Sequence, residues 1–343
     1  MTRAVIVSVA RTAIGKARRG AFNATHGATM AGHVARAAVE RAGIEPALIE
    51  DSIWGCGYPE YVTGGNIARQ AVIRAGLPVS IAGTTVNRFC ASGLQAIAMG
   101  AHAIVAEGAK SVLVGGVESI SLVQPPVRHS REPWIEARMP ALYMPMIETA
   151  DIVARRYGIS REAQDALGLQ SQQRTAAAQE AGRLDREIVP ITVIRAETDP
   201  ATGETAHVEI RLARDECNRP GTTLEALAKL EPVRGPDAFV TAGNASQLSD
   251  GAAALVMMDE AEAARRGIEP LGAFRGFAVA GCAPDEMGIG PVLAVPRLLE
   301  RQGLSVSDID LWELNEAFAA RLGIDDAICN VTAARSRSAI RSA

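Results

Sequence analysis

The stretch TTVNRFCASGLQAIAMGAHAIVAEGAKSVLVGGVES, from Thr84 to Ser119, decides how the rest of the chain is interpreted. Three β-branched residues lead into a turn that carries Cys90, and small residues follow the cysteine at once. An apolar run then continues to about Glu107, and a second apolar run begins at Ser111 and ends in two glycines. This order predicts a strand, a cysteine at the turn, a buried helix and a second strand.

Cys90 is a candidate nucleophile because it precedes the predicted helix. The positive end of a helix dipole stabilises a thiolate, which is the reactive form of cysteine. The small residues after it leave room for a substrate beside the backbone N–H groups at the helix start. The alternative is a buried small hydrophobic residue, as free cysteines often are. This stretch alone leaves both interpretations open.

The composition is that of a globular protein. Of the 343 residues, 48% are hydrophobic and 22% charged, and the length predicts two domains. A net charge of −4 gives no indication of a nucleic-acid partner. No apolar run is long enough to span a bilayer, so we expect a cytoplasmic protein. The scattered cysteines show no metal-ligand spacing and suit a reducing compartment; they are Cys56, Cys90, Cys217, Cys282 and Cys329.

Strands alternate with helices through the first part of the chain. This alternation predicts a largely parallel sheet with helices on its faces. The first two predicted helices end at Gly43 and Gly76, since glycine favours a helix C-terminus. The predicted strands are 4–9, 49–55, 84–86 and 111–114, and the predicted helices are 28–42, 66–75 and a third that ends near 107.

The pattern changes after Ser119. Residues 122–146 are rich in Pro, Arg and Met without a clear period, which predicts a long functional loop. Beyond it we expect helices at 149–157, 160–181, 223–229 and 260–266, short strands at 189–194 and 208–212, and a buried strand that ends at 258.

A repeat indicates a duplicated α/β unit. ERAGIEPALIEDSIWG (40–55) and ERQGLSVSDIDLWELN (300–315) both predict a helix end, a glycine, an acidic linker and an apolar strand containing Trp. Upstream, 272–279 matches the first strand and 295–301 the first helix. A second copy of the cysteine turn should follow, but the tail has lost the apolar pattern.

A series of motifs, in their order, makes the chain resemble the thiolase family over nearly its whole length. They are RTAIGK (11–16), NRFCASGLQAI (87–97), GGVESIS (115–121), SREAQD (160–165), TTLEALAKL (222–230), TAGNASQLSDGAA (241–253), MGIGPV (287–292) and NEAFAA (315–320).

The resemblance implies two similar α/β halves packed into a five-layer αβαβα fold, with an inserted loop domain. We expect the N-terminal half at 1–120 and 241–268, a loop domain that binds coenzyme A at 121–240, and a truncated C-terminal half at 269–343. Self-association into a homodimer or homotetramer is implied in the same way.

The implied reaction is reversible Claisen chemistry on coenzyme A thioesters, as in fatty acid metabolism. A 3-ketoacyl-CoA is cleaved to acetyl-CoA and a shortened acyl-CoA, or two acetyl-CoA molecules condense. Cys90 matches the cysteine that carries the acyl group as a thioester, which divides one hard step into two. Asn315 matches the asparagine that holds a water in an oxyanion hole.

Four further residues match positions that bind the substrate. Ser246, Met287 and Phe318 match positions around the pantetheine arm and the thioester. Arg219 matches a position near the nucleotide end of coenzyme A. The resemblance implies coenzyme A thioesters as substrates, with no separate cofactor and with no metal, nucleic-acid or membrane partner.

The sequence departs from the family near its C-terminal end. A Gly-His-Pro turn, whose histidine activates the nucleophile, and a Cys-x-Gly turn, whose cysteine is the acid/base, do not occur. One choice of codons for residues 332–343, read with one adenine restored in front, encodes NGGAIAIGHPFG. We therefore hypothesise a one-base deletion after the Val331 codon.

Absence of both motifs predicts severely reduced turnover, since general acid–base groups contribute about 10²–10⁴-fold each. An incomplete second half also predicts exposed apolar surface and poor stability. Two alternatives to a working acyltransferase are a non-catalytic acyl-CoA-binding relative and a condensing enzyme of the ketoacyl-synthase type. The NEAFAA and TAGNAS motifs argue against the second.

Overall fold

The computed structural model describes residues 2–124 and 130–321. The chain forms two compact units. The first consists of residues 1–128, 179–217 and 247–274, and the second of residues 129–178, 218–246 and 275–343. The two units are defined by contacts in space. Residues 179–217, which lie within the predicted loop domain, belong to the first unit. The division into two family halves and a loop domain stays a prediction.

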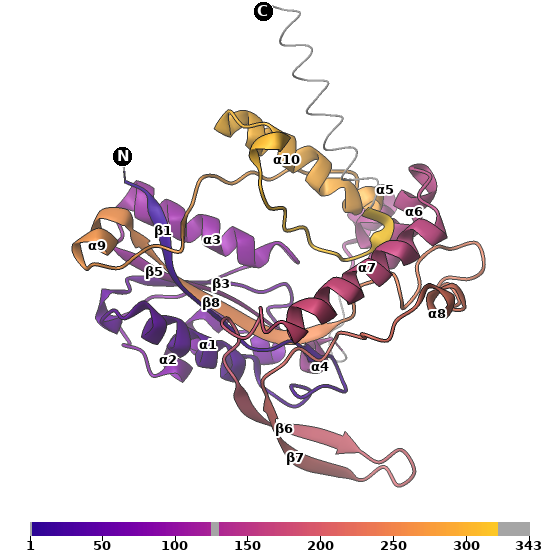
Figure 1. Cartoon of the computed structure of the whole chain (residues 1–343), viewed down its shortest axis with the longest axis horizontal. Coiled ribbons are helices and arrows are strands. Elements are labelled where there is room, and N and C mark those ends of the chain that lie inside the picture. The colour runs from indigo at the N-terminus through magenta and orange to yellow at the C-terminus, as the bar shows by residue number, and fades with distance from the viewer. Residues whose placement is uncertain (1, 125–129, 322–343) are drawn as a thin grey trace, which may run out of the picture. The chain divides into compact units, whose positions relative to one another are not determined.

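A seven-stranded sheet forms the centre of the first unit (Figure 1). Its strand order is β4–β3–β5–β8–β1–β9, and β2 pairs with β8. The strands are β1 Ala4–Arg11, β2 Gly15–Lys16, β3 Asp51–Gly55, β4 Thr84–Val86, β5 Ser111–Ser119, β8 Ser249–Asp259 and β9 Gly272–Ala273.

The prediction of a largely parallel sheet is confirmed for β4, β3 and β5 only. β8 lies between β5 and β1 and is antiparallel to both, so the sheet is mixed. A parallel neighbour is reached through a single crossover, usually a helix. The chain instead reaches β8 after the long segment 120–248, so β8 can enter the sheet in the direction opposite to β5.

Helices cover both faces of this sheet. α1 (Gly27–Ala42) and α2 (Ile67–Ala75) lie on one face, and α3 (Ser92–His102) lies on the other (Figure 1). Successive strand residues point to opposite faces. In β3, Trp54 therefore packs in the core cluster of α1 and α2, whereas its neighbour Ile53 packs in the cluster of α3.

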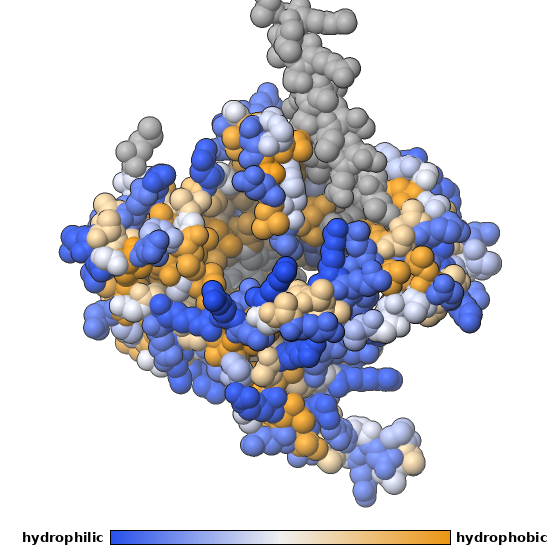
Figure 2. All heavy atoms as spheres, in the orientation of Figure 1, coloured by the Kyte–Doolittle hydropathy of each residue, from blue (hydrophilic) through white to orange (hydrophobic). Residues whose placement is uncertain are grey.

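α3 is an unusually apolar helix. It continues into a π-helical turn, and the stretch Phe89–Glu107 is long and apolar enough to cross a membrane by length and composition. Ala96 and Ala101 of this stretch are buried in a core cluster with residues of β3 and β5. One face of this stretch is therefore buried, whereas Leu94 and Val105 are 57% and 51% exposed, so the predicted burial of the helix is confirmed on one face only. Figure 2 shows apolar residues exposed between hydrophilic ones over the region of α3.

The first unit also contains a two-stranded hairpin and two short helices, and the second unit is mainly helical. The hairpin consists of β6 (Ile191–Thr198) and β7 (Thr205–Leu212), and the short helices are α4 (Ile120–Val123) and α9 (Glu260–Arg265). The second unit contains α5 (Pro133–Arg138), α6 (Met146–Arg156), α7 (Arg161–Glu180), α8 (Leu224–Ala228) and α10 (Gly290–Gln302). The predicted loop at 122–146 therefore includes a helical turn.

The repeat is confirmed in its helix but not in its strand. α10 ends at Gly303 as α1 ends at Gly43, both with the glycine in the left-handed conformation. Residues 309–315, however, form no strand. Trp54 in β3 is fully buried, whereas Trp312 is 43% exposed. β3 has strand partners on both edges, and a strand needs such partners for its backbone hydrogen bonds.

Arg11, at the end of β1, ties the sheet to two segments that are distant in sequence. Its Nη1 lies 2.7 Å from Asp215 Oδ1, and its Nε lies 2.7 Å from Glu187 Oε1. The Asp215 side chain is only 13% exposed and also accepts the Ile14 N–H at 2.7 Å. The ion pair therefore fixes the segment that follows β1.

We expect Arg11→Met to lower the free energy of unfolding by about 3 kcal/mol, because it leaves a largely buried carboxylate without its cation. Urea denaturation measures the change. Arg3→Met is the matched control, since the Arg3–Glu260 pair is exposed and solvent screening should leave its contribution small. Equal losses in the two variants would contradict the assignment of Arg11 as a structural anchor.

Candidate active site

The turn between β4 and α3 places Cys90 directly before the helix. Ala91 is the N-cap residue, Ser92 begins α3, and no side chain caps this helix. The N–H groups of its first turn are therefore not taken up by a capping side chain. The predicted position of Cys90 is confirmed, and its thiol is exposed, so the alternative of a buried hydrophobic residue is wrong.

Hydrogen bonds on both sides of Cys90 hold the turn. Asn87 Oδ1 accepts the Phe89 N–H at 2.7 Å. On the other side, Ser92 Oγ donates to the Phe89 carbonyl at 2.6 Å and accepts the Arg88 N–H at 2.8 Å. Phe89 has a φ of 46°, in the left-handed region that few non-glycine residues adopt. The turn before the cysteine is therefore strained and fixed by side chains.

A pocket of about 360 Å³ opens beside Cys90. Glycines from β3, α3 and β5 leave the space, and of these only Gly93 is among the small residues predicted to make room after Cys90. The other walls come from the end of β1, the end of β5 and the start of β8. Lining residues include Arg11, Gly55, Phe89, Cys90, Gly93, Gly116, Glu118 and Asp250.

Glu118 is the pocket residue that sequence reasoning missed. It belongs to the GGVESIS motif and stands near the carboxyl end of β5, which is parallel to β3. Ligand sites of α/β sheets gather at the carboxyl ends of parallel strands. The position of Glu118 near the end of a predicted parallel strand could therefore have identified it as a site residue from the sequence.

Burial sets the protonation of two groups near this pocket. It raises the pKa of the Glu118 carboxyl, although the N–H groups of Gly57 and Tyr58 partly offset the shift. Burial, and then the nearby charge of Glu118, raises the pKa of the Cys56 thiol to about 12. Cys56 is therefore protonated at neutral pH and buried, which excludes it as the nucleophile.

The Cys56 shift predicts a loss of stability in alkaline solution. The pKa of Cys56 in the folded chain, about 12, lies above the ordinary value of 9.0, so the unfolded chain releases this proton first. Its contribution to stability is thus complete below pH 9 and declines between pH 9 and 12. From pH 8 to pH 10 we expect the wild type to lose about 1 kcal/mol more than Cys56→Ala. Urea denaturation at both pH values measures this, and parallel curves would contradict it.

In the second unit, the TAGNAS and NEAFAA motifs pair with each other. The Ser246 N–H donates to the Ala317 carbonyl at 2.9 Å, and the Ala319 N–H donates to the Asn244 carbonyl at 2.9 Å. Asn244 is buried, and its amide donates to Asp165 Oδ1 at 2.9 Å. Asn244 therefore ties the TAGNAS segment to α7 within the second unit.

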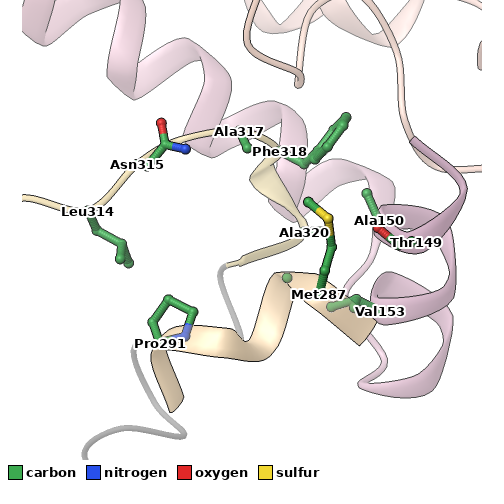
Figure 3. A pocket seen from close by; sticks show the side chains of 11 residues that line it. Thr149, Ala150, Val153, Met287, Pro291, Leu314, Asn315, Ala317, Phe318 and Ala320 are labelled. Carbon is green, nitrogen blue, oxygen red and sulfur yellow. The ribbon is translucent and has the colours of Figure 1, made fainter. Parts of the chain in front are cut away.

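Three predicted site residues line one small pocket in this unit. Met287, Asn315 and Phe318 surround a cavity of about 60 Å³ with residues of α6 (Figure 3). Met287 comes from the 3₁₀ helix Pro284–Ile289 and extends toward the segment that carries Phe318 (Figure 3). The structure thus brings together Met287, Asn315 and Phe318, with Ser246 bonded to the same segment.

The other predicted residues lie elsewhere. Arg219 is exposed and does not line this pocket, and its N–H donates to Gln172 Oε1 at 2.7 Å. Cys90 belongs to the first unit. The tail from residue 322, with its predicted frame change and Cys329, lies outside the described residues. Within residues 2–124 and 130–321, no group of three or more His, Cys, Asp or Glu could hold a metal ion.

Residues 4–261 match the family model "Thiolase, N-terminal domain", and residues 268–334 match "Thiolase, C-terminal domain". This chain belongs to the thiolase family. The first match spans the strand–turn–helix that carries Cys90, and the second spans the NEAFAA segment. The mixed α/β thiolase fold is therefore established for this family member.

Similar thiolases extend along almost the whole chain. A 3-ketoacyl-CoA thiolase of Bacillus subtilis is 43% identical over 96% of this chain and 86% of that protein. An acetyl-CoA acetyltransferase of Rhizobium meliloti is 41% identical over 95% of this chain and 85% of that protein. The crystal structure of the Bacillus anthracis acetyl-CoA acetyltransferase superimposes with a TM-score of 0.83 at 35% identity, covering 96% of this chain and 84% of that one.

These comparisons make the chain an acyltransferase by family. They give no support to the predicted truncation and frame change, because the relatives match about 96% of the chain and the C-terminal-domain match runs to residue 334. An incomplete second half is likewise not confirmed. The five-layer arrangement stays a prediction.

Proposed function

We propose that this thiolase transfers acyl groups between coenzyme A thioesters through a thioester on Cys90. The observation that carries the proposal is the position of one exposed thiol directly before an uncapped helix, at the wall of a glycine-lined pocket. A substrate carbonyl can reach a thiol at this position, and the thiolate is the nucleophilic form of cysteine.

The first half-reaction joins this thiol to a thioester. The Cys90 sulfur attacks the carbonyl carbon of an acyl-CoA and forms a new carbon–sulfur bond. The bond to the coenzyme A sulfur then breaks, and the departing thiolate takes up the proton that Cys90 lost. Covalent catalysis of this kind replaces one difficult transfer by two easier ones.

The second unit supplies candidates for the rest of the substrate. The apolar side chains of Met287 and Phe318 suit the pantetheine arm and the thioester, and Ser246 adds a hydroxyl on the adjoining segment. The Asn315 amide is the proposed holder of a water that stabilises the developing enolate charge. Arg219 is the proposed partner of the phosphates, because its guanidinium group is exposed.

The impairment of turnover, the location of the protein and its oligomeric state stay predictions. The sequence contains no Gly-His-Pro and no Cys-x-Gly motif, and this predicts severely reduced turnover. The comparisons give that impairment no support. A cytoplasmic location, expected from the sequence pattern, and a homodimeric or homotetrameric state, implied by the resemblance, belong to the proposal.

Thiolysis of acetoacetyl-CoA tests the proposed function. We expect the chain to consume acetoacetyl-CoA and coenzyme A and to release acetyl-CoA. A variant in which NGGAIAIGHPFG replaces residues 332–343 tests the predicted impairment. If the impairment holds, this variant catalyses thiolysis faster than the unaltered chain. Binding of coenzyme A with no acyl transfer in either chain would favour the non-catalytic alternative and overturn the proposal.

A further inference from the structure

Gly57 lies where the segment after β3 meets both Glu118 and the turn that carries Cys90. Its N–H donates to Glu118 Oε1. A Cβ atom at Gly57 would stand 3.0 Å from Glu118 Oε1 and 3.5 Å from the Phe89 backbone. The glycine is therefore pressed between the carboxylate on one side and the cysteine turn on the other.

A chain of hydrogen bonds leads from this glycine to the nucleophile. The Gly57 carbonyl accepts a hydrogen bond from Asn87 Nδ2 at 3.2 Å, and Asn87 Oδ1 accepts the Phe89 N–H at 2.7 Å. Phe89 immediately precedes Cys90 and holds the left-handed conformation described above. A strained residue of this kind persists only when its surroundings over-determine it.

Keeping a carboxylate in this position is costly for the fold. Burial raises the pKa of Glu118, which shows that its charged form is penalised where it lies. Buried acids are retained when hydrogen bonds compensate them, and here the partners include the backbone N–H groups of Gly57 and Tyr58. The carboxylate thus anchors the backbone that supports the cysteine turn.

We propose that Glu118 is a positioning residue for Cys90, acting through Gly57 and Asn87. The carboxylate fixes Gly57, the Gly57 carbonyl orients the Asn87 amide, and Asn87 holds Phe89 so that the Cys90 sulfur stays at the helix start. This inference rests on the proposed function, in which Cys90 is the nucleophile.

The rate at which iodoacetamide alkylates Cys90 tests the inference without any coenzyme A ester. Mass spectrometry of the Cys90 peptide gives the rate for that thiol alone. Glu118→Ala should lower it about tenfold, since small misplacements of a reacting group are costly. Glu118→Gln should stay within about threefold of the wild type, because its amide oxygen still accepts the Gly57 N–H.

Glu216→Ala is the matched control. Glu216 Oε2 also accepts backbone N–H groups in the first unit, from Lys16 at 2.9 Å and Ala21 at 3.2 Å, but it lies off the path to Cys90. Its removal should lower the melting temperature and leave the alkylation rate of Cys90 unchanged. A loss of rate in this variant equal to that of Glu118→Ala would overturn the inference.

Asn87→Asp provides a second route if Glu118→Ala does not fold. The aspartate keeps an acceptor for the Phe89 N–H and loses the donor to the Gly57 carbonyl, so alkylation should slow. A wild-type rate in Asn87→Asp, or a rate in Glu118→Gln as low as in Glu118→Ala, would overturn the inference.

The outcome is separable from that of the proposed function. Acyl loading from acetyl-CoA is measured on the wild type in a second reaction. A wild type whose Cys90 takes up no acetyl group overturns the proposed function, whereas the alkylation rates of the variants decide the role of Glu118 by themselves.

Discussion

Replacement of Cys90 by alanine should abolish exchange of labelled coenzyme A into acetyl-CoA, with a loss of about 10³-fold or more. The exchange requires only that the thiol take the acetyl group from one coenzyme A molecule and return it to another. It therefore reports the first half-reaction and does not depend on a later acid or base. The rate of appearance of labelled acetyl-CoA is the measurement.

Cys217→Ala provides the control for this experiment. Cys217 is half-buried in the same unit, and its Sγ lies 3.6 Å from Ser249 Oγ. Burial raises the pKa of the Cys217 thiol, so it should contribute nothing to exchange. Exchange that survives in Cys90→Ala, or that disappears in Cys217→Ala, would assign the chemistry to another group.

Gly55→Ala should lower the free energy of unfolding by about 3 kcal/mol and also slow alkylation of Cys90. Gly55 ends β3 and faces the start of α3. A Cβ atom there would overlap the backbone of Ser92 and Gly93, which cannot turn away as a flexible side chain would. The first turn of α3 must therefore shift, and Cys90 shifts with it. Urea denaturation and alkylation kinetics measure the two effects.

Gly93→Ala is the matched comparison for Gly55→Ala. A Cβ atom at Gly93 meets nothing within 4 Å, and alanine is a better helix former than glycine. Its stability should equal or slightly exceed that of the wild type. If Gly55→Ala were as stable as Gly93→Ala, the close approach of β3 to the helix start would be contradicted.

The features predicted best are those that depend on residues close together in the sequence. The β-branched run, the cysteine turn and the apolar helix became β4, Cys90 and α3, although α3 ends at His102 and a π-helical turn completes the predicted stretch to Glu107. α1 and α2 end at the predicted glycines, each in the left-handed conformation that glycine adopts without strain. These features depend on neighbours in the chain, which a sequence displays directly.

Features that depend on distant partners were harder to predict. The direction of β8 is fixed by its pairing with β5 and β1, which lie far away in the sequence. The segment around Trp312 carries an apolar pattern, but no strand partner orders it, and it forms no strand within the described residues. An apolar pattern shows that a strand is possible, whereas pairing decides whether it forms.

The site residues divide in the same way into those that local motifs identify and one that depends on distant contacts. Motif resemblance selected Cys90, Asn315, Ser246, Met287 and Phe318. In the structure Met287, Asn315 and Phe318 line one pocket, and the pairing of the TAGNAS and NEAFAA segments joins Ser246 to the segment that carries Phe318. Glu118 was missed because its connection to Cys90 passes through Gly57 and Asn87. The spacing of these residues in the sequence does not indicate that they are connected by hydrogen bonds. This connection is visible only in the folded structure.

The most direct test of the account is the identity of the residue that carries an acetyl group after incubation with acetyl-CoA. The chain is quenched in acid, digested and analysed by mass spectrometry. The account predicts one acetyl group on the Cys90 peptide as a thioester that hydroxylamine removes. An unmodified Cys90 peptide, or an acetyl group on a different cysteine, would contradict it.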